Sequence, residues 1–423
     1  MSIKSKIQLI VLMSMAALSL KAQSNQQQKP DLGALMEIAT TEHPMVRARR
    51  ADVEVANSER KGAAWQYWPT PSINFQRPDK VLIPGSDRSV QIINIRQPLW
   101  SGGRLDAQLM QAEARTRIAM ASSQEAKREI AFELLQTFGD AYIAHSKIKA
   151  TSASLEVHQD LMKKIQRRTS EGLSVASDTQ LAHTRLQGVM ADLLHIQNSL
   201  DISFNKLNSL VNRSIDNRPL IFPGFKFKNE DLNYFDKAFL FDPTLERLNA
   251  EAAEIKAQIQ IHQSSLWPEI YANISSRRGD VTGSASQVLI GVESKLGGGL
   301  SNLTAIEAVK KKLIGKYEEI ENRKRRLSEQ ISADQKLIAS LHERAKAYAQ
   351  ALKSSQEVAQ SWNRQFLAGK KTSQDIMNAA KETSQTEIQM LESLGSAAVA
   401  EWRLGILING LEQVIHQAKE ILQ

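Results

Sequence analysis

The chain has 423 residues, of which 42% are hydrophobic, 24% charged and only 5% aromatic. Aromatic rings fill wide globular cores, so this composition favours the narrow seams between long helices. The absence of cysteine excludes disulfide bonds, thiolate catalysis and cysteine-ligated metal sites, and the net charge of +8 is diluted by neighbouring acidic residues, so we expect no nucleic-acid partner.

The first residues have the pattern of a secretory signal. Lys4 and Lys6 precede the apolar stretch 7–20, and the small residue Ala22 follows it, which predicts a signal peptide over residues 1–22. The stretch is too short for a stable spanning helix, and no later window offers about eighteen uninterrupted apolar residues. We therefore expect an exported protein without a helical membrane anchor.

Two long tracts lack proline, one between Pro98 and Pro219 and one from Pro268 to the C-terminus. Both tracts can be continuous helix, and apolar residues recur in them at helical spacing. From Gly103 to Gly172 there are 69 positions. At about 1.5 Å per residue such a helix is roughly 100 Å long, which fits no compact globule. A soluble coiled coil fits these tracts equally well.

Landmarks of the first half return in the second half at nearly equal intervals, which indicates an internal duplication. The pairs are His43-Pro44 with Asp242-Pro243, Trp68-Pro69 with Trp267-Pro268, Gly102-Gly103 with Gly298-Gly299, and Gly172 before Asp178 with Gly369 before Asp375. We place the first structural repeat at 23–212, a linker at 213–241 and the second repeat at 242–423.

Helix signals stop after each Trp-Pro pair, where each repeat has two short segments typical of a β-hairpin. The predicted strands are 72–77 and 90–97 around a polar turn at 78–88, and 270–277 and 287–293 around a polar turn at 279–286. In the last strand Val288, Ile290 and Val292 share one face and Gln287, Gly291 and Glu293 the other, with only Leu289 breaking the alternation. This pattern is typical of a wall between lipid and water.

Four strands cannot close a membrane barrel, because the smallest known barrels have about 8. Open strand edges are not tolerated in lipid. The sequence therefore predicts a barrel that several copies of the chain build together.

Aromatic residues gather at the ends of the predicted strands: Trp65, Tyr67, Trp68, Trp100, Trp267 and Tyr271. Indole and phenol rings are enriched at membrane interfaces, so we interpret them as interface residues. They can equally be packing anchors at helix ends, and the two roles can coexist.

Each long helical tract has a turn near its middle. The first turn is Gly172-Leu173-Ser174 and the second is Gly369-Lys370-Lys371. Each repeat is thus predicted to be a strand hairpin standing on a long helical hairpin.

No catalytic or metal-binding motif occurs in the chain. The eight histidines are scattered and form no His-Glu-x-x-His pair. The run Gly297-Gly298-Gly299 lacks the setting of a nucleotide-binding loop, and we expect a strand-to-helix turn there. We predict no enzyme activity, no cofactor and no metal. A soluble periplasmic coiled coil or adaptor protein is the alternative, and the paired strand hairpins argue against it.

Taken together, nearly the whole mature chain resembles the TolC family of outer-membrane channel proteins. The residues that carry the resemblance are His43-Pro44, Trp68-Pro69, Gln97-Pro98-Leu99-Trp100-Ser101-Gly102-Gly103-Arg104, and Gly172-Leu173 with Asp178. The second repeat departs from the pattern at 294–299, which lacks the proline and the tryptophan.

The resemblance implies a mainly α-helical fold with membrane β-strands. Three subunits would share a twelve-stranded barrel in outer-membrane lipid, continued by a tunnel of helices through the periplasm. The chain would be the passive exit duct of a tripartite efflux pump or a type I secretion system. Its partners would be a periplasmic adaptor, docked on Gly172, Leu173, Ser174, Gly369 and Lys370, and an inner-membrane transporter. The transported substrate stays open.

The resemblance also implies a gate near the second helical turn. By position, the gate acid is Asp375, its basic partner Lys371, the aromatic partner Phe366 and the acid of the first repeat Asp178. The family's second gate acid is replaced by Asn378, and Phe366 has no hydroxyl, so we expect a single acidic ring. Alternatively, Asp375 only caps the helix that follows Gly369.

Overall fold

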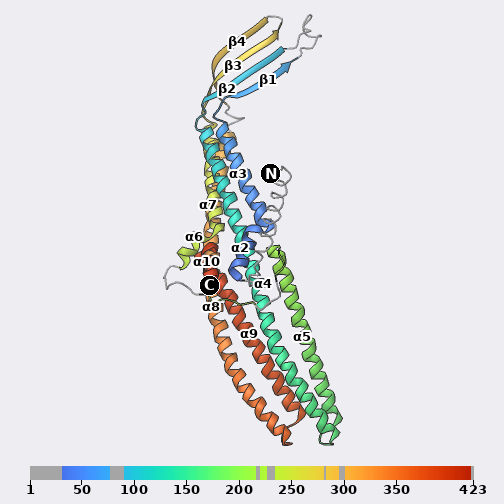
Figure 1. The fold of residues 1–423 in the computed structure, drawn as a ribbon. Helices are drawn as coiled ribbons and strands as arrows, with labels where there is room; N and C mark the ends of the chain where they lie inside the picture. The colour runs from blue at the N-terminus through green and yellow to red at the C-terminus, as the bar shows by residue number, and fades with distance from the viewer. Residues whose placement is uncertain are drawn as a thin grey trace, which may run out of the picture.

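The computed structural model describes residues 31–76, 90–215, 220–225, 234–280, 283–294 and 301–420. A four-stranded sheet lies at one end of a long helical body, and two helical hairpins form the other end (Figure 1). The predicted signal peptide, the first predicted strand turn and Gly297-Gly298-Gly299 lie outside the described residues.

The helices occur in pairs of nearly equal length. Helices α3 (Pro44–Trp65) and α7 (Pro243–Ser264) have 22 residues each, and α4 (Arg104–Ser170) and α8 (Ser301–Leu367) have 67 each. The returning helices α5 (Ala176–Val211) and α9 (Ser373–Asn409) have 36 and 37 residues. These lengths confirm the internal duplication and the two long helical hairpins.

The starts of α3 and α7 follow from their local sequence. Each helix has proline at its first position, where the missing N–H costs nothing. The residue before the proline is the cap: His43 Nδ1 accepts from the Met45 N–H at 3.3 Å, and Asp242 Oδ1 accepts from the Leu245 N–H at 2.9 Å. The His43-Pro44 and Asp242-Pro243 landmarks are thus equivalent helix starts.

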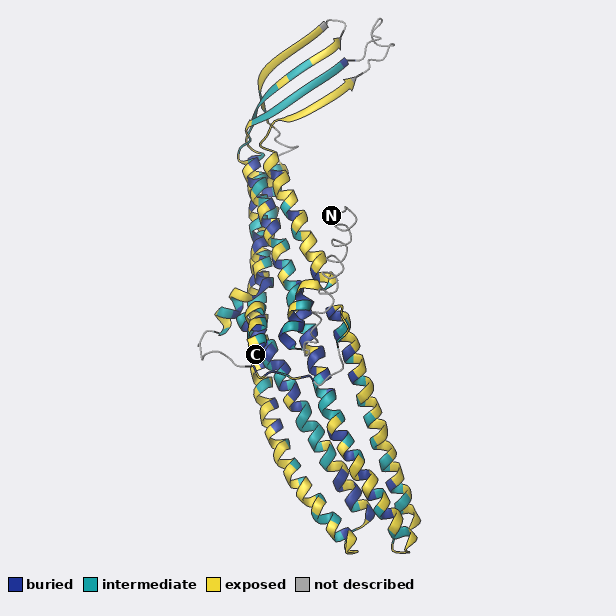
Figure 2. Ribbon diagram, viewed as in Figure 1, coloured by how far each residue is buried: buried dark blue, intermediate teal, exposed yellow. Residues whose placement is uncertain are grey.

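Small residues on the long helices explain the low aromatic content. On α4, Ala107, Ala114 and Ala121 recur every seven residues and are at most 1% exposed. A seven-residue repeat of small apolar residues gives a narrow helix–helix seam. Buried residues accordingly alternate with intermediate and exposed ones along the helices (Figure 2). Within the described parts of the chain, no helix is long and apolar enough to cross a membrane.

The sheet consists of β1 (Thr70–Gln76), β2 (Val90–Trp100), β3 (Glu269–Asp280) and β4 (Gly283–Glu293), antiparallel and in that spatial order. Both predicted hairpins are confirmed. The second polar turn is shorter than predicted, because most of 279–286 belongs to the strands. Backbone pairing extends them: Ser276 lies opposite Ser286, and their hydroxyls are 3.0 Å apart.

The two faces of the sheet differ in polarity, as predicted. Val288, Ile290 and Val292 on β4 are 74%, 71% and 68% exposed. Their partners on β3 are Ile274, Ala272 and Ile270, so this face is apolar on both strands. The opposite face carries Gln287, Gly291 and Glu293, with Leu289 as the exception. Exposed apolar rows of this kind are typical of a lipid-facing surface.

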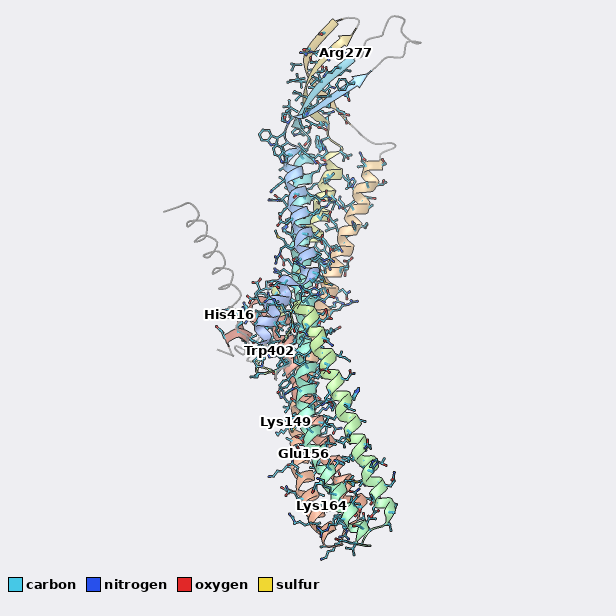
Figure 3. The ribbon with its side chains drawn as sticks, turned by 45° about the vertical axis from the view of Figure 1, so that its right-hand side comes forward. Lys149, Glu156, Lys164, Arg277, Trp402 and His416 are labelled. Carbon is cyan, nitrogen blue, oxygen red and sulfur yellow. The ribbon has the colours of Figure 1, made fainter. Side chains whose placement is uncertain are left out.

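A thicker core lies midway along the molecule, where α2 (Leu32–Glu42), α6 (Tyr234–Phe241) and α10 (Leu411–Glu420) surround the long helices. Figure 3 shows Trp402 in this region, far from Arg277 on the sheet and Lys164 near the helical turns. The Trp402 side chain is fully buried and donates from Nε1 to the Pro223 carbonyl at 2.8 Å. The segment 220–225 is thereby fixed across α9.

A buried carboxylate joins three helices near this core. Asp242 is only 2% exposed, and it binds Arg128 of α4 at 2.9 Å and Arg323 of α8 at 2.5 Å. Burial alone would raise the pKa of Asp242, but the hydrogen bond from Arg323 and the charge of Arg128 hold it below its ordinary value. This cluster fixes the start of α7 against both long helices.

Candidate functional site

The two helical turns at the far end have the same geometry. The Leu173 N–H donates to the Arg168 carbonyl at 2.8 Å, and the Lys370 N–H donates to the Gln365 carbonyl at 2.9 Å. Gly172 and Gly369 have φ values of +73° and +74°, which glycine adopts without strain. Both turns are therefore Schellman motifs that end α4 and α8 in the same way. Leu173 is 61% exposed, so this turn presents an apolar side chain at the molecular surface.

Asp375 lies in the first turn of α9 and forms a capping box with Thr372, the N-cap residue. Its Oδ2 accepts from the Thr372 N–H at 3.0 Å and from the Thr372 hydroxyl at 2.9 Å, and its own N–H donates to Thr372 Oγ1 at 3.2 Å. Hydrogen bonds from the Thr372 backbone, then from its hydroxyl, and the charge of Lys371 lower the pKa of Asp375. The capped carboxylate therefore keeps its negative charge at neutral pH.

Lys371, the predicted basic partner, lies beside Asp375. Its Nζ is 4.0 Å from Asp375 Oδ2 and 4.0 Å from the centroid of the Trp362 ring. The ammonium group therefore has both a carboxylate and an aromatic face as neighbours. Asn378 is exposed one turn further along α9.

Asp178 joins the two helical hairpins of one subunit. It lies in the first turn of α5, and its Oδ2 accepts from the hydroxyl of Ser373 in α9 at 2.9 Å. Ser373 is only 2% exposed, so water competes little for this bond. Ser373 was not predicted from the sequence, because a lone serine at a helix start carries no signal for a contact 195 positions away.

Phe366 is buried inside the subunit, at 1% exposure. Its ring belongs to an apolar core formed by Leu161, Ile165, Ala182, Ile376, Met377 and Ala380, which we name the tip core. Arg168, also missed by the sequence, crosses from the first hairpin: Nη1 donates to the Phe366 carbonyl at 3.2 Å, and the guanidinium carbon lies 4.9 Å from the ring centroid. Phe366 thus contributes its ring to the tip core and its backbone carbonyl to the hydrogen bond with Arg168.

We name two hydrogen-bonded pairs the tip ties: Ser373–Asp178 and Arg168–Phe366. Both connect the α4–α5 hairpin with the α8–α9 hairpin. Together with the apolar tip core, these polar contacts hold the two turns of one subunit next to each other.

The predicted interface tryptophans gather where helices meet the sheet. Trp65, Trp68, Trp100 and Trp267 are 44–69% exposed, and the Trp100 and Trp267 rings meet edge to face with centroids 6.3 Å apart. Exposed indoles beside an apolar sheet face suit a membrane interface, and the ring contacts show that they also pack on each other.

The two tyrosines of this region have polar roles. The Tyr67 hydroxyl donates to Asp106 at 2.5 Å, and burial together with this bond raises the pKa of Tyr67 to about 12. Tyr271 lies on the polar face of the sheet, where the Arg96 guanidinium stacks 3.7 Å from its ring centroid. Tyr271 also covers Gly291, where an added Cβ would lie 2.4 Å from the ring. Tyr271 therefore lies on the face of the sheet opposite the apolar face that carries Val288.

Among the described residues, no group of three or more His, Asp or Glu side chains could hold a metal ion. The ionisable groups with shifted pKa values, such as Asp242 and Asp375, are bound in helix caps and ion pairs. What the described residues show at this end is two hairpins joined by polar contacts.

Comparison with known proteins agrees with this geometry. Residues 35–213 match the family described as outer membrane efflux protein. A search of curated proteins finds no matching sequence.

Three solved structures illustrate the likeness. The chain is similar to the outer-membrane channel OprN (TM-score 0.81, 15% identity, 92% of each chain covered). It is also similar to the outer membrane protein VceC from Vibrio cholerae (0.76, 16% identity, 91% of this chain and 98% of that one). The Campylobacter jejuni outer membrane channel CmeC shares the fold as well (0.76, 10% identity, 93% and 89% covered).

A soluble coiled coil or adaptor is not favoured, because the sheet with its exposed apolar face is part of the shared fold. The family is one of transport channels and not of enzymes. Residues 35–213 are thus similar to the outer membrane efflux protein family, and the chain shares the fold of solved outer-membrane channels.

Proposed function

We propose that three copies of the chain form one channel, in which their sheets close into a single barrel surrounded by outer-membrane lipid. The observation that carries this proposal is the sheet itself. Its outer strands β1 and β4 each pair with only one strand among those described, while the apolar face is exposed. Unpaired edges are costly in lipid, and pairing β1 of one copy with β4 of the next satisfies them.

Cysteine crosslinking tests the closure, because the natural chain has no cysteine. Pairs are scanned with one cysteine on β1, around Asn74, and one on β4, around Gln287. Oxidation in intact cells should give covalent dimers and trimers. The matched control places cysteines at Asn94 and Ser275, which face each other within one sheet and should link within a single chain. If no β1–β4 pair gave products larger than one chain, the shared barrel would be wrong.

The helical turns are the proposed docking points for a periplasmic adaptor, which connects the duct to an inner-membrane transporter. Leu173 is exposed at one turn and Lys370 at the other, so both turns offer side chains to a partner. A photocrosslinking residue at Leu173 or at Lys370 should capture the adaptor. The same crosslinker at the exposed Glu54 on α3 is the control and should not capture it. Equal capture from all three positions would argue against docking at the turns.

The duct conducts passively, and its inner end opens and closes. In a trimer, three Asp375 carboxylates surround the entrance, and Lys371 lies 4.0 Å from each. The tip ties hold the two hairpins of each subunit together in the closed arrangement. This assignment is supported by the positions of Asp178, Ser373, Arg168 and Phe366 at the far end of the molecule.

A further inference from the structure

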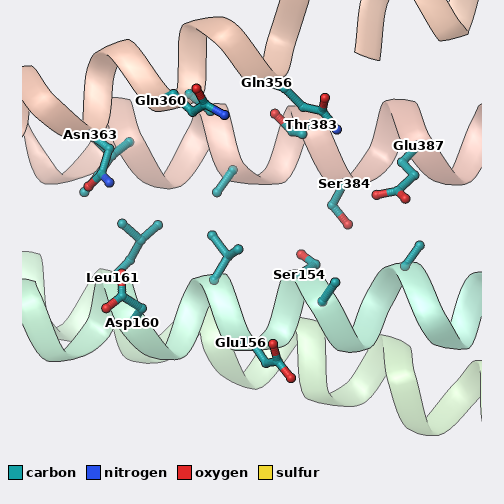
Figure 4. A pocket seen from close by; sticks show the side chains of 16 residues that line it. Ser154, Glu156, Asp160, Leu161, Gln356, Gln360, Asn363, Thr383, Ser384 and Glu387 are labelled. Atoms are coloured by element: carbon teal, nitrogen blue, oxygen red, sulfur yellow. The ribbon is translucent and has the colours of Figure 1, made fainter. Parts of the chain in front are cut away.

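A cavity of about 780 Å³ lies in the helical wall between α4, α8 and α9, next to the tip core (Figure 4). Small side chains line much of it: Ala150, Ala153, Ser154, Ala359, Ala380 and Ser384. Helix α9 packs between α4 and α8, so small residues on the three helices leave an open volume. The volume falls within the range of about 300–1,000 Å³ that is common for small-molecule sites.

One wall of the cavity is apolar. Leu161, Ile376 and Ala380 line it, and all three also belong to the tip core. Along α9 the cavity extends from Ile376 to Glu387, which is about 16 Å at about 1.5 Å per residue. The site therefore suits an elongated molecule with an apolar body.

Acidic groups lie at both ends of the cavity. Figure 4 shows Glu387 at one end, and Asp160 with Asn363 at the other. Within the described chain, Glu387 and Glu156 have no ion-pair partner, whereas Asp160 binds Lys164 at 2.6 Å. None of the described lining residues is a lysine or an arginine. The charge of the site therefore favours a cation.

A second observation points to a missing donor. The Asn363 Oδ1 atom is buried and has no hydrogen-bond partner in the described part of the chain. A buried acceptor without a donor is costly, so rotation of the Asn363 side chain toward a ligand N–H group at this end would be favourable.

We propose that this cavity binds elongated organic dications. One cationic group lies at Glu387, the other binds Asp160 in place of the Lys164 ammonium group, and an apolar linker lies against Leu161 and Ile376. Such a ligand touches α4, α8 and α9 at once. Because its contacts include residues of the tip core, an occupied site would favour one arrangement of the helical turns. The inference concerns binding by the purified protein and does not depend on export.

Calorimetric titration of the detergent-purified full chain with the aromatic diamidine pentamidine tests the proposal. The parent protein should bind it saturably, and benzamidine, which has one amidinium group, should bind much more weakly. Glu387→Gln should weaken pentamidine binding roughly tenfold, which is the usual effect of losing one charged hydrogen bond. Glu382→Gln makes the same charge change on α9 outside the cavity and should bind like the parent.

A variant that fills the cavity provides an independent test. Ala153 lines the cavity and is exposed, so Ala153→Trp should fold normally, as thermal unfolding would show, and should abolish pentamidine binding. The proposal is overturned if the parent shows no saturable binding. It is equally overturned if Glu387→Gln and Ala153→Trp both bind pentamidine as the parent does.

Discussion

Removing the Ser373 hydroxyl tests the role of the tip ties most directly. Ser373→Ala deletes the donor to Asp178 and leaves the carboxylate, the helix cap at Thr372 and the tip core in place. A hydrogen bond to a charged group contributes about 1.5–3 kcal/mol. Because Asp178 is partly exposed, we take about 1 kcal/mol for this tie.

The size of the effect depends on whether the three subunits open together. If each subunit opens independently, about 1 kcal/mol shifts its equilibrium toward the open arrangement roughly fivefold. If all three open in one concerted step, the losses add to about 3 kcal/mol, and the shift is roughly 150-fold. The measured factor therefore reports on cooperativity as well as on the tie.

Single-channel recording in planar bilayers measures the fraction of time that the channel is open. The control is Thr179→Val, which removes a hydroxyl 3.0 Å from Thr169 at the same end but within one hairpin. We expect Ser373→Ala to be open at least about fivefold more than the parent and Thr179→Val to match the parent. An open fraction unchanged by Ser373→Ala, or raised equally by Thr179→Val, would refute the reasoning.

Three further predictions concern the same regions. In planar bilayers, Asp375→Ala should reduce cation selectivity because it removes a ring of negative charge. Lys371→Ala should raise the resting conductance because it removes the contact with Asp375 at 4.0 Å, and two variants that both behave like the parent would contradict the gate. Gly172→Leu strains a turn with φ of +73° and should abolish export at normal outer-membrane abundance, measured by export assay and immunoblot. Folding lowers the pKa of Asp242, so its carboxylate stabilises the folded state at pH values above the unfolded pKa of about 4. This stabilisation is lost as the pH falls through the lower folded pKa, and Asp242→Asn should therefore flatten the acid dependence of the melting temperature.

Much of the fold could be predicted from periodicity and spacing. The equal 67-residue lengths of α4 and α8 correspond to the matching glycine positions in the two repeats. The exposed faces of Val288, Ile290 and Val292 follow from the two-residue period of a strand. These features are local or repetitive, so a single sequence reveals them. The extent of the second hairpin was not predicted, because Ser286, assigned to the turn, becomes a strand residue only through its pairing with Ser276.

The sequence by itself determined that each repeat has one strand pair and one helical hairpin. In each hairpin the long helix ends at a glycine, which adopts the left-handed conformation of the turn without strain. The spacing in the sequence also places Asp375 four residues after Lys371. Only the tertiary structure decided what Asp178 and Phe366 contact, because their partners Ser373 and Arg168 are 195 and 198 positions away. Contacts across such distances depend on how whole hairpins pack, and no local preference for helix, strand or turn encodes them.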